Sequence, residues 1–148
     1  MSYSNVYKNI DERSIKESKI LLKSGIWKKE TPLESKIQSV EKWLQAMSSI
    51  YNVSVPRFIF SDCSSGYKLT GGGTYSGSFK EITLYKKFSI VTLFHEFRHH
   101  LQHSKGIQLK LYRNDIEEDA RAWSVSLFKL AAPNSYQRAV ERGTLKFS

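Results

Sequence analysis

Cysteine is almost absent from this sequence, and long apolar runs are missing altogether. Cys63 is the single cysteine among 148 residues, so no intrachain disulfide can form and nothing indicates an oxidising compartment. No stretch approaches the roughly 18 consecutive apolar residues of a membrane span, and the charged N-terminal segment lacks the apolar core of a signal peptide. We therefore expect a soluble cytoplasmic protein with no membrane association.

Acidic residues are also scarce relative to basic ones. The 23 Lys and Arg against 14 Asp and Glu give a formal net charge of +9. Such a charge raises nucleic acid or an acidic substrate as a partner. The basic residues are nevertheless scattered, with no run of about five or six like charges and no stripe interleaved with aromatics. The charge alone favours a solvated basic surface, and nucleic acid stays an alternative partner.

Apolar residues are present in the amount that a packed core requires. They make up 40% of the chain, 13% is aromatic, and three tryptophans are spread along it. The length is typical of one domain. We expect residues 1–148 to form a single domain, with disorder confined to about the first ten residues and the last few.

Helical signals appear early in the chain. Apolar spacing over residues 11–24 predicts a short helix that Gly25 ends. The motif at residues 31–34, TPLE, offers Thr31 as N-cap, a proline at the first helical position and a capping-box glutamate. It predicts a second helix over residues 32–50.

Strand signals follow in the middle of the chain. Residues 53–60 are rich in β-forming side chains, although Pro56 argues for an edge strand or a bulge. Glycine-rich residues 71–77 indicate a turn or a strand rim. Residues 79–86, from Phe79 to Lys86, alternate in polarity and predict a half-buried strand antiparallel to its neighbour.

Two further helices are expected after the strands. Helical periodicity returns at Ser89, and Gly106 is a plausible stop. The last helix is expected to start near Asn114 or Asp115 and to end at about Ala132, before a proline. Helices, strands and then helices again are the pattern of an α+β fold.

The first of these late helices carries the motif HEFRHH, at residues 95–100. His95 and His99 are four residues apart, so a helix places both imidazoles on one face, one turn apart. Glu96 lies about 100° round the helix, where a carboxylate reaches a metal-bound water without ligating the metal. This is the HExxH arrangement, with the glutamate as general base. The alternative is a group of solvated polar residues on a half-buried helix.

A catalytic zinc needs a third protein ligand. His103 lies another turn along the same straight helix and cannot reach the same ion, and Cys63 is a weak candidate. The following helix offers Glu117, Glu118 and Asp119, and its apolar stripe separates them by phase. Glu118 points to solvent, whereas Glu117 and Asp119 lie on the two borders of the stripe. Phase alone leaves Glu117 and Asp119 as candidates.

These residues resemble a known family. HEFRHH, followed 18 residues after His99 by Glu117-Glu118-Asp119-Ala120, looks like the gluzincin branch of the zinc metallopeptidases, whose third ligand is commonly the glutamate of a Glu-x-x-Ala pattern. The sequence is most similar to small single-domain ImmA/IrrE-type and SprT-like proteins, over about residues 53–132. The resemblance implies a zincin-like minimal metallopeptidase domain: N-terminal helices, a small mostly antiparallel sheet, the HExxH helix and a third-ligand helix. It also selects Glu117 over Asp119.

The function that the resemblance implies is zinc-dependent hydrolysis of a protein or peptide substrate. His95, His99 and Glu117 would hold Zn²⁺ and an activated water, with Glu96 as the general base. One alternative is a basic, nucleic-acid-associated module of the SprT-like kind. The other is a non-catalytic metal-binding module that serves protein interaction.

Supporting roles are less constrained by the sequence. Tyr112, His103 and Arg121 are candidates for stabilising an oxyanion, and Asp119 or Asp115 for a hydrogen bond to the outer nitrogen of a ligating histidine. Arg98, His100 and, apart from that candidate role, His103 are expected to be bystanders of the metal site, with His100 exposed to solvent. The strand over residues 79–86 is a candidate for pairing with an extended peptide, and equally a plain structural edge strand.

Overall fold

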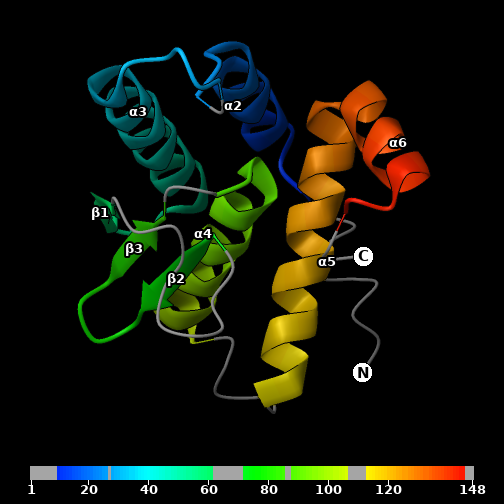
Figure 1. Ribbon diagram of the computed structural model, residues 1–148. Helices are drawn as coiled ribbons and strands as arrows, with labels where there is room; N and C mark the ends of the chain where they lie inside the picture. Colours follow the sequence, from blue (N-terminus) through cyan, green and yellow to red (C-terminus); the bar gives the residue numbers. More distant parts are fainter. Residues whose placement is uncertain (1–9, 27, 62–71, 86–87, 107–112, 146–148) are drawn as a thin grey trace.

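The computed structural model describes residues 10–26, 28–61, 72–85, 88–106 and 113–145 (Figure 1). Within them the expected α+β class is confirmed, with five helices and a three-stranded sheet. The elements are α2 (Glu12–Lys23), α3 (Leu33–Tyr51), β1 (Arg57–Phe60), β2 (Gly73–Ser76), β3 (Glu81–Leu84), α4 (Ile90–Lys105), α5 (Arg113–Ala131) and α6 (Pro133–Arg142). The segment expected to be disordered lies, up to residue 9, outside the described residues. None of the described helices has both the length and the apolar character that crossing a bilayer requires.

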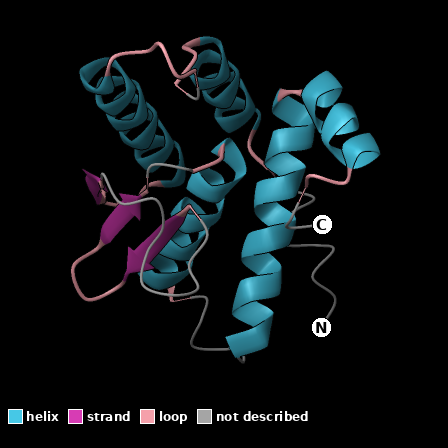
Figure 2. Cartoon of the chain, viewed as in Figure 1, coloured by secondary structure: helices cyan, strands magenta, loops and turns pink. Residues whose placement is uncertain are grey.

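Helix α4 lies at the centre of the molecule, between the sheet and α5 (Figure 1, Figure 2). Its ends are those that the sequence predicts: the Ser89 side chain accepts the backbone N–H of Thr92, and Gly106 follows with a φ of 69°. Twelve of its 16 residues are buried. Because the helix is enclosed nearly all round, its polar side chains have to find partners inside the protein.

Aromatic side chains hold α3 and α5 against α4. Trp43 of α3 stacks on Phe94 with ring centroids 5.3 Å apart and meets Phe97 edge-on at 5.2 Å. Trp123 of α5 lies 6.3 Å from Phe97. Such pairs contribute about 0.5–1.5 kcal/mol each beyond the burial of their apolar area. The core therefore fixes both neighbouring helices relative to the HEFRHH motif.

The sheet is mixed, with the order β1-β3-β2. β3 pairs antiparallel with β2, placing Tyr75 opposite Ile82, and parallel with β1, placing Phe58 opposite Ile82. The expectation of a mostly antiparallel sheet is therefore wrong for one of the two pairs. β3 inserts between β1 and β2, so β1 is an edge strand as Pro56, which directly precedes it, indicates.

Two helix boundaries differ from the prediction. The Thr31 hydroxyl does not cap α3 but donates to the Gly25 carbonyl at 2.8 Å, and Pro32 occupies the cap position. Helix α6 was not expected, because Pro133 was interpreted as a stop. It instead stands in the first turn of a new helix, where its missing N–H costs nothing.

Candidate metal centre

Two imidazoles on α4 point their Nε2 atoms at each other. The Nε2 atoms of His95 and His99 are 3.1 Å apart, and the rings lie edge to face with centroids 4.7 Å apart. Their side chains are 6% and 14% exposed. The spacing of four residues on one helix produces this pair, because successive turns stack such residues on the same face.

Glu117, near the start of α5, completes the group. Its Oε2 lies 3.2 Å from Nε2 of His95, and its Oε1 lies 3.2 Å from Nε2 of His99. The carboxylate therefore spans both imidazoles, and its own side chain is 44% exposed. Among the described residues, His95, His99 and Glu117 are a set of ligand types whose donor atoms all lie within 4.8 Å of one another. This group could hold a metal ion.

The spacing of these donor atoms suits a small tetrahedral ion. Bonds of about 2.0–2.2 Å at tetrahedral angles separate neighbouring ligand atoms by about 3.3–3.5 Å. The three measured separations of 3.1, 3.2 and 3.2 Å are close to the edges of such a tetrahedron. Two imidazoles and a carboxylate are also a donor set that zinc accepts, with the fourth position left for water or substrate.

Charge and burial perturb the protonation of the group. Hydrogen bonds from His95 and then His99 hold the pKa of Glu117 well below its usual range, against the opposing effect of burial. For His99, burial disfavours the charged ring, but the Glu117 hydrogen bond and the Glu96 charge outweigh it and raise the pKa. A cation bound here would displace a proton from the group, as metal binding to histidine does in general.

Glu96, next to His95 in the sequence, has a carboxyl pKa that is shifted in the opposite direction to that of Glu117. Its residue is 8% exposed, and burial raises the pKa of its carboxyl, against the lowering effect of the His95 and His99 charges. The charge of Glu117 raises it further. A carboxyl with a raised pKa next to a metal group is suited to taking up and releasing a proton.

The two imidazoles lie in the sector of α4 between β2 and α5. The β2 hairpin, which is β2 with the turn that follows it (residues 73–80), runs along this side of α4. Cβ atoms added to Gly73 and Gly77 would meet the side chains of Thr92 and His103. With Thr92 set at 0° and about 100° per residue, His103 falls at about 20° and the imidazoles at about 300° and 340°. Arg98 and Gln102, which hydrogen-bond to α5, fall at about 240° and 280°. The donor atoms therefore lie between the β2 hairpin and α5.

The structure separates the two carboxylates that helix phase left open. Asp119 is 0% exposed, and its two oxygens accept from Arg98 at 2.8 and 3.2 Å. The guanidinium also lies over the Trp123 ring, 5.6 Å from its centroid. Asp119 thus neutralises a buried cation, while Glu117 faces the imidazoles. Arg98 is, as expected, not a member of the group of ligand candidates, but it is buried and joins α4 to α5.

His100 is likewise buried and paired, although it was expected to be exposed. It is 0% exposed, with Nε2 2.7 Å from the Ser54 carbonyl and Nδ1 2.8 Å from the Tyr75 hydroxyl. Burial lowers the pKa of His100 and raises that of Tyr75 to about 12. No pattern in the sequence indicates this contact, because the partners of His100 belong to β2 and to the segment before β1.

The other predicted site residues are placed elsewhere. Cys63 and Tyr112 lie outside the described residues. Arg121 is exposed on α5, and His103 is exposed in the last turn of α4, 6.3 Å from Tyr75 between ring centroids. Asp115 is half-buried in the first turn of α5. None of these described side chains joins the group of three ligand candidates.

The strand expected to pair with a peptide is unsuited to that role. Residues 81–84 of the predicted strand form β3, which is central and already paired on both edges with β1 and β2. A central strand has no free hydrogen-bonding edge for an incoming chain. The prediction that residues 79–86 bind an extended peptide is therefore wrong.

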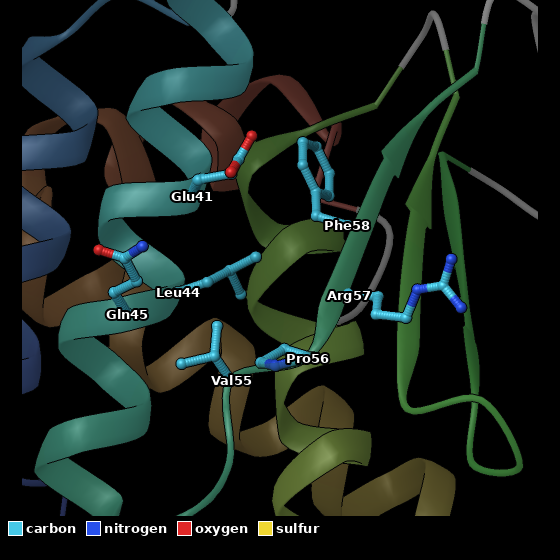
Figure 3. Close-up of a pocket in the computed structure, with 7 residues that line it drawn as sticks. All are labelled: Glu41, Leu44, Gln45, Val55, Pro56, Arg57 and Phe58. Carbon is cyan, nitrogen blue, oxygen red and sulfur yellow. The ribbon is translucent and has the colours of Figure 1, made fainter.

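A separate pocket lies between α3 and β1 (Figure 3). It has a volume of about 180 Å³. Leu44, Pro56 and Phe58 are among its apolar lining, with Glu41 on the α3 side. None of its lining residues belongs to the His95–His99–Glu117 group, so the pocket is not part of the candidate metal centre.

Comparison with known proteins assigns no identity to this chain. It matches no protein-family model, no curated protein and no solved structure. A function therefore has to follow from the chain's own residues.

Proposed function

We propose that this protein is a zinc-dependent peptidase with a zincin-like, gluzincin-type site. The observation that carries the proposal is the convergence of the His95, His99 and Glu117 donor atoms at separations of 3.1–3.2 Å. Glu96, in the second position of HExxH, is buried beside them. Two histidines one helical turn apart, a carboxylate from the next helix and an adjacent glutamate are the components of such a site.

Each residue has a definite part in the proposed reaction. His95, His99 and Glu117 would hold Zn²⁺, which when bound would lower the pKa of water to about 7 and polarise a carbonyl. The Glu96 carboxylate would accept the proton of the attacking water at one oxygen and deliver it to the leaving amide nitrogen. The raised pKa of Glu96 favours uptake of the proton from water, because burial stabilises the protonated carboxyl relative to the carboxylate.

The strand next to the site supports a peptide substrate. Among the described strands β2 pairs only with β3, and its hairpin borders the sector of α4 that holds the imidazoles. An extended peptide could add to β2 as a further strand and hydrogen-bond with its backbone. It would also bring a peptide carbonyl alongside the metal group.

The test compares wild type with Glu96→Gln for zinc content and for cleavage of a peptide library. We expect one zinc per chain in both proteins, and a fall in cleavage of about 10²–10⁴-fold in the variant, the range that a general base supplies. Glu118→Gln, an exposed neighbour of the third ligand, is the matched control and should cleave at the wild-type rate.

Three outcomes separate the alternatives. A folded wild type without stoichiometric zinc would contradict the proposal outright. Zinc binding without cleavage that depends on Glu96 would instead favour a non-catalytic metal-binding module. Zinc content and cleavage that are both unaffected by Glu96→Gln would remove that residue from its assigned role.

A further inference from the structure

A buried polar chain runs from α5 to the outer nitrogen of one imidazole. Arg98 is 6% exposed, Gln102 is 1% and Asp119 is 0%. Nε2 of Gln102 lies 2.7 Å from Oδ2 of Asp119, the same oxygen that accepts from Arg98. Oε1 of Gln102 lies 2.8 Å from Nδ1 of His99. The amide of Gln102 therefore connects the Arg98–Asp119 ion pair to the metal group.

The orientation of this amide is fixed by its partners. Besides Asp119, the nitrogen of Gln102 lies 2.9 Å from the backbone carbonyl of Ile116. A carboxylate and a carbonyl can only accept hydrogen bonds, so the atom facing both of them has to be the NH₂ group. The opposite orientation would set two oxygens against the amide oxygen within a site closed to water.

The orientation of the amide in turn favours one tautomer of His99. The Gln102 oxygen can only accept, so Nδ1 of His99 has to carry the hydrogen that it receives. The protonated ring donates to both Gln102 and Glu117. When the ring loses one hydrogen, the shorter contact, 2.8 Å to Gln102 against 3.2 Å to Glu117, favours Nδ1–H and leaves the lone pair on Nε2. Only an unprotonated nitrogen can ligate a metal.

The same amide also holds the backbone next to the third ligand. Ile116, whose carbonyl accepts from Gln102, directly precedes Glu117. One side chain thus orients a ring on α4 and fixes the position of α5 at the turn that carries the Glu117 carboxylate. The two contacts together place the donor atoms from both helices.

We propose that Gln102 is a positioning residue, which holds His99 in its Nδ1–H tautomer and α5 in the register that brings Glu117 to the imidazoles. The inference rests on the proposed function for its metal consequence. The tautomer itself is a property of the metal-free chain. Asp119, clamped by Arg98, provides the fixed acceptor that keeps the amide from turning.

The test uses Gln102→Met, which keeps the length of the side chain and removes its hydrogen bonds to His99, Ile116 and Asp119. Arg98 and Asp119 still pair in this variant, so no buried charge is left alone. We expect zinc affinity, measured by competition with a chelating dye, to fall by about 10–100-fold, the usual cost of removing a hydrogen bond that orients a ligating histidine.

A spectroscopic readout distinguishes positioning from a general loss of stability. With four histidines in the chain, ring ¹⁵N signals of the metal-free protein can be assigned, at a pH where His99 is neutral. We expect the Nδ1–H form of His99 in wild type and a substantial Nε2–H population in Gln102→Met. Leu127→Val, a 0% exposed apolar site on α5, is the control: it should lower the melting temperature but change neither zinc affinity nor tautomer.

The outcomes are separable from those of the proposed function. A wild type that binds no zinc would defeat the peptidase proposal, and the His99 tautomer would then decide the Gln102 inference alone. An Nε2–H form of His99 in wild type, or a tautomer unchanged by Gln102→Met, would overturn the inference. If wild type binds zinc, a zinc affinity of Gln102→Met within about twofold of wild type would also overturn the inference, because a hydrogen bond that orients a ligating histidine is worth more than that.

Discussion

At the scale of single residues, two carboxylates two positions apart on α5 have different tasks. Glu117 is partly exposed and spans two imidazoles, whereas Asp119 is fully buried against Arg98. The difference follows from burial, because a guanidinium inside a protein needs an anion and hydrogen bonds at hand. Asp119 is committed to that cation, which leaves Glu117 to complete the metal group.

Glu117→Gln tests this division of tasks. The amide retains the size of the side chain but loses the charge, so we expect zinc affinity to fall by at least about tenfold, as losing a direct ligand costs no less than losing an outer partner. Isothermal titration with zinc measures the change. Glu118→Gln removes the same charge from the next residue and should bind zinc as wild type does; equal losses in both variants would point to a general charge effect.

The limits of sequence reasoning are visible at this scale. Helix phase reduced three acidic residues to Glu117 and Asp119, and the resemblance to gluzincins favoured Glu117, the one that reaches the imidazoles. Arg98 and His100 were nevertheless interpreted as bystanders. Their partners come from α5, from β2 and from the segment before β1. No periodicity within one helix can identify partners on other elements.

At the scale of elements, glycine decides how closely β2 approaches α4. A Cβ on Gly73 would lie 2.9 Å from the Thr83 carbonyl oxygen, 2.9 Å from Leu84 Cδ2 and 3.0 Å from Thr92 Cγ2. A backbone oxygen and two side chains thus leave no room for a Cβ at residue 73. Two residues on, Tyr75 bonds to His100 on the same helix. Close packing of β2 on α4 therefore depends on the missing side chain at residue 73.

Gly73→Ala is expected to lower the free energy of unfolding by about 1–3 kcal/mol, the usual cost of overpacking a filled site. Denaturant titration followed by tryptophan fluorescence measures it. Gly77→Ala is the matched variant, because the three atoms nearest to its Cβ belong to the ring of the exposed His103, the closest at 3.0 Å, and not to backbone. A shift of a few tenths of an ångström by this exposed side chain relieves the contact, so the change should be smaller than that of Gly73→Ala; similar losses at both glycines would contradict the packing account.

At the scale of the whole molecule, the candidate metal centre joins elements that are distant in sequence. α4 supplies His95 and His99, and α5 supplies Glu117. A ligand that binds the folded protein and not the unfolded chain adds its binding free energy to stability. Zinc should therefore stabilise the α4–α5 pair, and through it the fold.

Metal removal tests this coupling. At a free zinc concentration of about 100 times its dissociation constant, we expect about 2.7 kcal/mol of added stability and a higher melting temperature. Chelation by EDTA should reverse the gain, and Glu117→Gln should show a smaller shift at the same zinc concentration. Calorimetry with and without zinc gives the measurement. A melting temperature that does not respond to zinc in wild type would contradict a folded-state metal site.

The sequence by itself determined the local features of this protein. The His95–His99 spacing, the Ser89 cap and the Gly106 stop all follow from residues within about one helical turn of each other, and the α+β order follows from successive periodicities. The tertiary structure alone decided that β3 lies between β1 and β2, that His100 is buried, and that Gln102 joins His99 to Asp119. These depend on which elements pack together, since a buried polar group takes its partner from whatever element packing brings beside it.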